Sequence, residues 1–449
     1  MFYKKILTPG LAHHTYMIGA EEAIAVIDPM RDVGKYLHEA RKAGMRIKYI
    51  LETHRNEDYI SGSRELAHQT GARIYLSGHE ELGYEFGEKI WDGFRLDIGG
   101  MTLEALHTPG HTLGHMSYAL YEKDMEAACM VFTGDCMFMG DFGRTDFYGK
   151  ENLDKMTGLL YDSLFRKILP LGGHVILLPA HGAGSACGKS MDDRPYSTLG
   201  YEQLKNDLLR VASKEEFIDR FAEMRIKPQY FDTMEKLNVE GAAFVADEVI
   251  LNPLSPGEVK KLPDSVLLID VRSKEAYIGG HIPGSLYLSQ SNLTAYLGAL
   301  YPTDQEIAFI TEGKMDEMEE IYWYCRRMGF DRIRGYLPEG IKTWQAEGFE
   351  VEQFETVSAK EYKKMPKGDD FVLLDIRSPE EIKESDPDLH SVNIPLKILR
   401  EELDKLPRDK DIYVLCSSGN RSTTAASCLK MAGLKPIVIT GGAEMYRKI

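Results

Sequence analysis

The sequence predicts an α/β protein of several domains, and its length and an internal repeat both support this class. The chain has 449 residues, and at roughly 100–200 residues per domain this length predicts two to four domains. The segment at residues 267–273 recurs at residues 372–378, which places Asp270 and Asp375 105 residues apart. Each copy is an apolar run that ends in Asp-x-Arg-Ser, as expected for a buried parallel strand that leads into a loop.

Strand-like and helical segments alternate after each copy of this repeat. Further apolar runs at residues 306–311 and 411–415 predict strands, each followed by a helix and a closing strand. This alternation predicts βαβ units and a parallel sheet. We therefore expect two small α/β domains, at residues 251–352 and 358–449, joined by the charged, aperiodic segment 352–357.

Residues 1–250 are predicted to form a first domain of mixed α/β layers. Helical periodicity at residues 201–231 predicts a helical extension at its C-terminal end. The Pro and Gly residues at 253–257 place the domain boundary near residues 247–254. Short apolar runs predict the strands of this domain, at residues 16–19, 23–29, 49–54, 72–76, 101–107, 116–121, 130–134 and 175–179.

Composition restricts the class of protein and the kind of partner. The 43% of hydrophobic and 28% of charged residues are ordinary for a globular protein, and no apolar run reaches the roughly 18 residues of a membrane span. The net charge of −16 argues against nucleic acid and anionic membranes as partners. Six cysteines without paired spacing, and an N-terminus without an export signal, predict a reducing cytoplasmic location. We therefore expect small-molecule chemistry.

Histidine and aspartate residues stand at the ends of four predicted strands in the first domain. These residues are His54, His111, Asp135 and His181, each next to turn-forming residues. Metal ligation requires neutral imidazoles and carboxylates that are held rigidly, and strand ends provide this rigidity. Taken together, the four strand ends indicate a metal site.

This set of strand ends resembles the metallo-β-lactamase fold superfamily, whose usual signature is Thr-His-x-His-x-Asp-His. The resemblance implies an αββα sandwich for residues 1–250. The segment at residues 53–59 departs from the signature, because Asn56 and Tyr59 stand where the second and third His are expected. A two-zinc hydrolase of the glyoxalase II type needs all of these ligands, so a binuclear site is not expected.

The residues that keep the pattern are two histidines and one carboxylate, His54, His111 and Asp135. Two His and one carboxylate are the ligand set of non-haem Fe(II) oxygenases. The mononuclear iron members of the superfamily, the persulfide dioxygenases, carry their iron on matching positions and share the Gly-Arg-Thr-Asp-Phe stretch at residues 143–147. The resemblance therefore implies one Fe(II) per chain. It places six further residues around the metal, Asn56, Asp58, Tyr59, Arg144, Asp146 and His181.

A catalytic thiol is predicted beside this site. Cys187 lies six residues after His181 in a Gly-rich loop, which resembles the persulfide dioxygenases that are fused to rhodanese domains. With Lys189 nearby, we expect this loop to keep Cys187 exposed and thiolate-like. A buried, inert cysteine is the alternative.

A second reactive thiol is predicted at Cys416, directly after the strand-like run at residues 411–415. The pattern Cys-x-x-Gly-x-Arg-Ser leads into a helix expected to begin near Thr423, so backbone N–H groups, the helix N-terminus and Arg421 should favour the thiolate. The pattern resembles the rhodanese active-site loop, in which the cysteine carries a transferable sulfur as a persulfide. Cys-x5-Arg phosphatases are the alternative, although their loop is usually one residue longer. The residues expected to cradle the sulfur are Ser417, Ser418, Gly419, Asn420 and Ser422.

The first copy of the repeat lacks this chemistry. The position equivalent to Cys416 is Thr311, which is followed by acidic residues and no loop Arg. This copy resembles a rhodanese domain in residues 269–272 and 280–284, so we interpret it as a structural spacer or docking module. The active copy departs from the family at residues 388–392, where Gly-His-Ile-Pro-Gly is expected.

The order of the parts resembles bacterial fusions of a persulfide dioxygenase with a sulfurtransferase. The resemblance implies that O2 oxidises a low-molecular-weight thiol persulfide to sulfite and thiol at the iron, and that a persulfide on Cys416 converts sulfite into thiosulfate. We expect a homo-oligomer that binds no nucleic acid and no membrane. Two alternatives stay open: a sulfurtransferase with an inactive metallo-β-lactamase-fold scaffold and, more weakly, a glyoxalase II-like thioester hydrolase fused to rhodanese.

Overall fold

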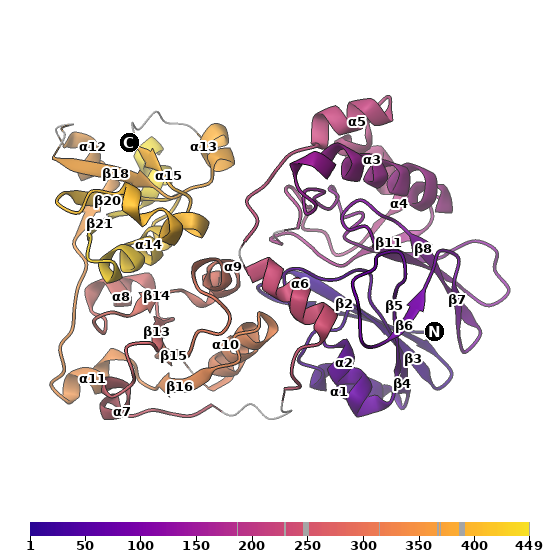
Figure 1. Cartoon of the computed structure of the whole chain (residues 1–449), viewed down its shortest axis with the longest axis horizontal. Coiled ribbons are helices and arrows are strands. Elements are labelled where there is room, and N and C mark those ends of the chain that lie inside the picture. The colour runs from indigo at the N-terminus through magenta and orange to yellow at the C-terminus, as the bar shows by residue number, and fades with distance from the viewer. Residues whose placement is uncertain are drawn as a thin grey trace. The chain divides into compact units, whose positions relative to one another are not determined.

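The computed structural model describes residues 1–185, 187–228, 230–245, 251–313, 315–365, 368, 370–385 and 391–448 (Figure 1). The chain forms two compact units, Met1–Lys227 with Phe231–Glu248 and Pro228–Tyr230 with Val249–Ile449. The boundary predicted near residues 247–254 lies partly outside the described residues. Within the described ranges, no helix is long and apolar enough to cross a membrane.

The first unit contains two six-stranded sheets. The first sheet has the order β1 (Phe2–Thr8), β2 (His13–Ala20), β3 (Ala23–Ile27), β4 (Arg46–Leu51), β5 (Arg73–Ser77) and β6 (Glu88–Ile90). The second has the order β7 (Arg95–Ile98), β8 (Met101–His107), β9 (Met116–Tyr121), β10 (Met130–Gly134), β11 (Ile176–Pro179) and β12 (Ser197–Thr198). Each sheet is mixed. In the first, β1, β2 and β3 pair antiparallel and β3 to β6 pair parallel. In the second, β10 and β11 pair parallel and the other described pairs are antiparallel.

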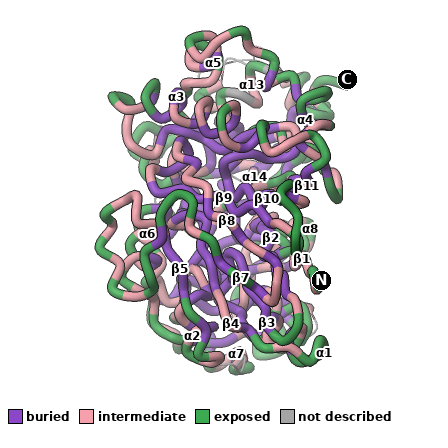
Figure 2. Tube along the Cα trace, turned by 90° about the vertical axis from the view of Figure 1, so that its right-hand side faces the viewer, coloured by how far each residue is buried: buried purple, intermediate pink, exposed green. Residues whose placement is uncertain are grey.

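One apolar cluster joins the inner faces of the two sheets. Tyr16 and Ile18 of β2 pack there with Tyr118 of β9 and Phe132 of β10. Met17, which lies between the two β2 residues, belongs instead to the outer cluster that holds the helices, as the two-residue period of a strand requires. The strands consequently run through the buried interior of the unit (Figure 2).

Helices cover both outer faces, which confirms the αββα sandwich. Helices α1 (Gly34–Ala43) and α2 (Ser63–Thr70) lie over the first sheet, and α3 (Leu153–Ser163) and α5 (Lys214–Phe221) over the second (Figure 1). The helical stretch predicted at residues 201–231 is interrupted. It contains α4 (Leu199–Lys205), α5 and the start of α6 (Tyr230–Glu240), because Ser213 caps a new helix at α5 and Pro228 precedes α6.

The second unit contains two parallel sheets. One has the order β14 (Leu286–Tyr287), β13 (Leu267–Asp270), β15 (Ile307–Ile310) and β16 (Ile333–Leu337). The other has the order β17 (Thr356–Ser358), β21 (Lys435–Thr440), β20 (Asp411–Leu415), β18 (Phe371–Asp375) and β19 (Val392–Asn393). The predicted α/β class with parallel sheets is therefore confirmed. The expected linker at residues 352–357 runs into β17, so part of it is strand.

Helices alternate with these strands along the chain. Those of the first copy are α7 (Pro256–Lys260), α8 (Lys274–Gly279), α9 (Gln290–Leu300), α10 (Met315–Arg327) and α11 (Ile341–Ala346). Those of the second copy are α12 (Ala359–Lys364), α13 (Pro379–Ser385), α14 (Asn420–Met431) and α15 (Gly442–Lys448). The departure expected at residues 388–392 falls partly outside the described residues.

The repeated Asp-x-Arg motif forms the same ion pair in both copies. Arg272 donates to both carboxylate oxygens of Asp270, and Arg377 does the same with Asp375, with Nη2···Oδ2 distances of 2.7 and 2.6 Å. All four side chains are buried at the carboxyl end of their strand. A buried charge needs a close partner. The repeated Asp-x-Arg motif in the sequence therefore reflects the same buried ion pair in both copies.

Candidate metal centre and thiol loop

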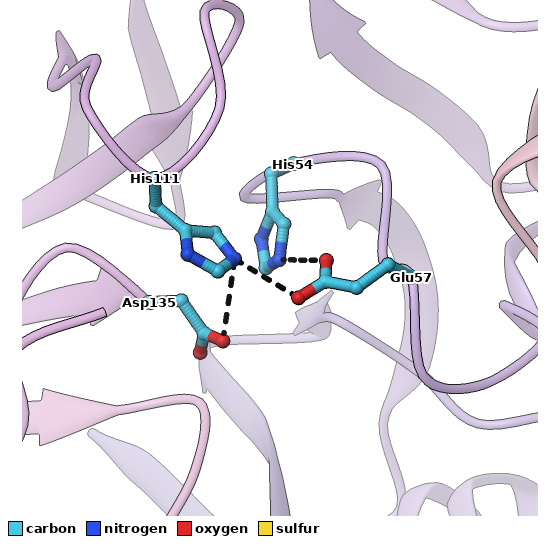
Figure 3. Close-up of side chains that lie close together, drawn as sticks. All are labelled: His54, Glu57, His111 and Asp135. Atoms are coloured by element: carbon cyan, nitrogen blue, oxygen red, sulfur yellow. Dashed lines mark ion pairs between the residues drawn. The ribbon is translucent and has the colours of Figure 1, made fainter. Parts of the chain in front are cut away.

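The structure brings the three predicted metal ligands together. His54 lies in the loop after β4, His111 in the loop after β8, and Asp135 directly after β10. All three side chains are buried, and the His111 Nε2 atom lies 3.6 Å from Asp135 Oδ2 (Figure 3). Three segments that are far apart in the sequence therefore present their polar ends to one point.

A fourth residue, Glu57, joins this group and was missed by the sequence interpretation. Its Oε1 lies 3.2 Å from His111 Nε2, and its Oε2 lies 3.6 Å from His54 Nε2 (Figure 3). One donor atom from each of the four residues lies within 4.8 Å of all the others. Glu57 occupies a variable position of the Thr-His-x-His-x-Asp-His signature, so the signature assigns it no role. Its acidic character within the motif was the available signal.

Hydrogen bonds determine which nitrogen of each imidazole faces the group. The Thr53 hydroxyl donates to Asp28 Oδ2, so it accepts at 2.8 Å from His54 Nδ1. His111 Nδ1 donates to the Arg144 carbonyl oxygen at 2.9 Å. Each Nε2 therefore carries a lone pair when its imidazole is neutral.

Acceptor atoms consequently face one another in this buried space. Both Nε2 atoms, Asp135 Oδ2 and Glu57 Oε2 are buried without a hydrogen-bond partner among the described residues. Although burial disfavours the charged imidazole, Glu57 and Asp135 raise the pKa of His111, which shows that this space favours a positive charge. Two imidazoles and two carboxylates are a donor set that suits a divalent transition metal. The residues present fit a metal ion.

His181 and Asp58 lie on the other side of Asp135. His181 Nδ1 is 2.7 Å from Asp135 Oδ1, and His181 Nε2 is 3.2 Å from Asp58 Oδ2. The two carboxylates raise the pKa of His181 well above its ordinary value, although burial opposes this. The imidazole therefore holds one oxygen of Asp135 and leaves the other free for the metal group, as a residue around the metal does.

Asn56 and Tyr59 lie outside the four-residue group. Asn56 donates to Glu52 Oε2 at 3.2 Å, and the Tyr59 ring packs against His13. Their loop is held by Asn238 of α6, whose amide donates to the carbonyl oxygens of Asn56 and Tyr59 at 2.6 and 2.8 Å. The helical extension thus positions the loop that carries His54 and Glu57, a role that its sequence pattern did not indicate.

Arg144 and Asp146 position the loop that supports His111. Arg144 donates to both oxygens of Asp146 at 2.6 and 2.7 Å, and its own carbonyl oxygen accepts from His111. A Cβ atom at Gly143 would collide with the carbonyl oxygen of Asp135. The Gly-Arg stretch therefore packs directly on the metal group, and only glycine allows so close an approach.

Cys187 lies beside the metal group, but not as an exposed thiolate. The residue is fully buried, and its thiol donates to Glu57 Oε1 at 3.3 Å. Burial, together with the neighbouring Asp58 and Glu57 carboxylates, raises the pKa of Cys187 well above its ordinary value. Lys189, which was expected to favour the thiolate, pairs with Glu223 instead. Asp58, His181 and Cys187 form a second group of donor atoms within 4.8 Å of one another.

Cys416 follows β20 at its carboxyl end, as predicted. The Gly419 N–H donates to its sulfur at 3.0 Å, and Gly419 has a φ of 97°, a left-handed conformation that favours glycine. Helix α14 begins at Asn420, three residues earlier than expected, and Ser422 is buried in its first turn. The tight Gly turn brings the N-terminus of α14 close to the sulfur.

Arg421 is held by a carboxylate that the sequence interpretation did not include. Its guanidinium donates to both oxygens of Glu381, at 2.8 and 2.6 Å, and to the Ser417 hydroxyl at 2.9 Å. Burial raises the pKa of Glu381, but the hydrogen bonds from Arg421 outweigh it and lower the pKa to about 2. Arg421, which we expected to favour the Cys416 thiolate, is therefore also positioned by an ion pair with Glu381.

The first copy, which has Thr311 at the position of Cys416, contacts the Cys416 loop of the second copy. Lys274 donates to the Ser418 carbonyl oxygen at 3.4 Å, Tyr287 donates to Asn420 Oδ1 at 2.9 Å, and Asn420 donates to the Ser289 hydroxyl at 3.2 Å. The equivalent loop of the first copy carries Glu312, 3.7 Å from Arg272. This copy thus has an acidic residue next to the position equivalent to Cys416, and it supports the loop of its neighbour.

The four remaining cysteines have no assigned role, although Cys136 directly follows Asp135 and Cys428 lies in α14. Burial raises the pKa of each of these thiols, Cys129, Cys136, Cys325 and Cys428.

Comparison with known families matches both halves of the chain. Residues 8–181 match the model of the metallo-beta-lactamase superfamily, and residues 255–347 and 358–448 each match the rhodanese-like domain. The crystal structure of a metallo-beta-lactamase from Staphylococcus aureus is 30% identical and has a TM-score of 0.68. Its alignment covers 75% of this chain and 99% of that one. The order of the parts is therefore that of the predicted fusion.

Two curated relatives match the first unit. Human persulfide dioxygenase ETHE1 is 29% identical over 233 residues, which are 51% of this chain and 84% of that protein. The hydroxyacylglutathione hydrolase GloC of Haemophilus influenzae is 29% identical over 213 residues, which are 43% of this chain and 90% of that protein. Sequence identity alone does not separate an oxygenase from a hydrolase here.

Proposed function

The chain belongs to the metallo-β-lactamase superfamily and continues into two rhodanese-like domains, and from this premise we propose that it is a persulfide dioxygenase and sulfurtransferase. In the first reaction, R–S–SH, O2 and water give R–SH, sulfite and two protons. In the second, sulfite attacks the outer sulfur of a persulfide on Cys416. The S–S bond to Cys416 breaks, the S–S bond of thiosulfate forms, and Cys416 leaves as a thiolate.

The observation that carries the proposal is the convergence of His54, His111 and Asp135 on one buried space. Two histidines and one carboxylate suit a single non-haem Fe(II), which supplies the electrons that activate O2 when bound. Thr53 and the Arg144 carbonyl orient the two imidazoles, and His181 orients Asp135. The conformation of Asn56, which is directed to Glu52, supports a mononuclear site.

The two thiols, Cys187 and Cys416, are proposed to have different roles. Cys187 is proposed to act as a thiol beside the metal, which its contact with Glu57 supports. Cys416 is proposed to carry the transferable sulfur, cradled by Ser417, Ser418, Gly419, Asn420 and Ser422. Arg421 is proposed to attract dianionic sulfite by charge-assisted hydrogen bonds while Glu381 holds its guanidinium in place.

The test is the iron content and the persulfide-dependent O2 uptake of freshly purified protein. We expect about one iron per chain, as proposed for a three-residue site, and O2 uptake with glutathione persulfide. His111→Ala should abolish both, whereas His68→Ala, a change at an exposed histidine of α2, should alter neither. Full metal occupancy in His111→Ala would contradict the assignment of the metal ligands.

The same preparation distinguishes the alternatives. Sulfur transfer without iron and without O2 uptake would favour a sulfurtransferase with an inactive scaffold. The similarity to GloC favours a thioester hydrolase as the second candidate. Hydrolysis of a glutathione thioester by the metal-loaded protein, with no persulfide-dependent O2 uptake, would support that candidate.

A further inference from the structure

Glu57 meets the same structural criteria as the three residues assigned to the metal. Its side chain is only 2% exposed, and its carboxylate lies 3.2 Å from His111 Nε2 and 3.6 Å from His54 Nε2 (Figure 3). From this we propose that Glu57 is a fourth protein ligand of the metal. The inference rests on the proposed metal-dependent function and adds a ligand that the two-His, one-carboxylate pattern does not contain.

The orientation of the imidazoles carries this inference. Because the Nδ1 atoms of His54 and His111 are both engaged, their Nε2 lone pairs point toward the Glu57 carboxylate, which is also an acceptor. Acceptors that face each other in a dry space repel unless a cation lies between them. Asp135 Oδ2 stands in the same relation to His111 Nε2, at 3.6 Å. A single cation among the four atoms satisfies all of them.

The charges of the group also favour a fourth ligand. Two neutral imidazoles and two carboxylates carry two negative charges, which balance one divalent cation. With Asp135 as the sole anionic ligand, the buried centre would keep one net positive charge, and an uncompensated buried charge is costly. Glu57 therefore makes the resting centre neutral. A metal with six positions would then have two positions left for other ligands instead of three.

The competing role for Glu57 is that of a proton acceptor for Cys187. The Cys187 thiol donates to Oε1, but a thiol is a weak donor and it engages one oxygen only. Oε2 has no hydrogen-bond partner among the described residues and faces His54. A role toward Cys187 alone leaves this second oxygen unexplained, whereas metal ligation uses it.

The experiment measures metal binding without turnover. Wild type, Glu57→Gln, Glu57→Ala, Asp135→Asn and Glu65→Gln are each loaded with Fe(II) or Co(II) and titrated with a competing chelator. Glu65 is a buried carboxylate of α2 outside the metal group, so Glu65→Gln is the matched control. We expect about 10–100-fold weaker metal binding in both Glu57 variants and a changed visible absorption spectrum of the Co(II) protein. The control should match wild type.

The comparison with Asp135→Asn separates the two proposals. Wild-type affinity and an unchanged Co(II) spectrum in both Glu57 variants, together with loss of metal in Asp135→Asn, would overturn the role of Glu57 and leave the proposed function intact. Wild-type affinity in Asp135→Asn as well would overturn the metal site itself. Circular dichroism verifies folding, and the isosteric Glu57→Gln provides the result if Glu57→Ala does not fold.

Discussion

A single hydroxyl proton determines which face His54 presents to the metal group. Asp28 is buried and accepts from both the backbone N–H and the hydroxyl of Thr53, at 2.7 and 2.8 Å. The hydroxyl therefore has only a lone pair left for His54 Nδ1. Losing a hydrogen bond to a buried carboxylate is costly, so this three-residue chain holds the ring rigidly. The orientation of the His54 ring thus gives a physical reason for the Thr that precedes His in the motif.

Cys187→Ser tests whether a thiol beside the metal takes part in sulfur transfer. We expect the yield of thiosulfate to fall more than O2 uptake, because the serine removes a possible sulfur acceptor while the metal ligands stay in place. Oxygen electrode measurements and mass spectrometry of the products provide the comparison. Cys325→Ser, a change at a buried cysteine of the second unit, is the control. Equal losses of both activities would argue against a separate role for Cys187 in sulfur transfer.

Sequence analysis identified site candidates whose residue type and local motif suggest metal binding. It missed the residues that join a site only through the folding of distant or unremarkable segments. His54, His111 and Asp135 stand out because several His- and Asp-bearing strand ends occur together, and the structure brings these three side chains close to one another. Glu57 is one of 70 acidic residues, most of which are expected in solvent, and nothing local marks it as buried. Glu381 was missed because it lies 40 residues before the Arg421 that it binds.

At the scale of elements, the strand, Gly turn and helix around Cys416 together determine the surroundings of its sulfur. Strand β20 ends at Leu415, directly before the cysteine, Gly419 turns the chain, and α14 begins at the next residue. The Gly419 N–H consequently points at the sulfur. Sequence pattern predicted this arrangement well because each part is local. It placed the start of α14 too late, since Asn420 to Ser422 have no apolar periodicity.

Arg421→Ala tests the charge at this helix N-terminus. Removing the guanidinium takes away the positive charge that offsets Glu381, whose carboxylate still accepts from Ser378 and Ser417. The remaining negative charge makes the approach of dianionic sulfite unfavourable. We expect the sulfite-to-thiosulfate step to slow by about 10–100-fold, as the loss of a hydrogen bond to a charged group implies. Sulfite should accumulate while the iron content stays unchanged. Rapid-quench product analysis measures the step. In Glu381→Gln the guanidinium remains, so we expect a smaller decrease in the rate of this step. Equal rates in Arg421→Ala and wild type would contradict a role for Arg421.

At the scale of the whole molecule, the proposed function places two reactions in one chain. Cys416→Ser should eliminate sulfur transfer to sulfite while persulfide-dependent O2 uptake persists, because Cys416 and the metal group belong to different units. The products should shift from thiosulfate to sulfite, as measured by mass spectrometry. Thiosulfate at the wild-type level, with no additional sulfite, would mean that the two reactions are not coupled through Cys416.

The domain organisation was the most predictable feature of the chain. The 105-residue repeat indicated two related α/β domains, because a buried strand followed by Asp-x-Arg imposes the same apolar and charged pattern each time. The contribution of the first copy to the Cys416 loop could not be predicted. It depends on side chains such as Tyr287 and Lys274 that meet the loop only after both sheets have formed.

If the proposed function holds, the burial of three cysteines limits their reaction with the persulfide substrate. Persulfides exchange sulfur with thiolates, and a protonated thiol is a poor nucleophile. Cys136, Cys325 and Cys428 are buried, and burial raises the pKa of each thiol. We therefore expect them to form fewer adducts in a persulfide solution than accessible cysteines do. The proposed chemistry would thereby leave the packing of the interior around these three cysteines unchanged.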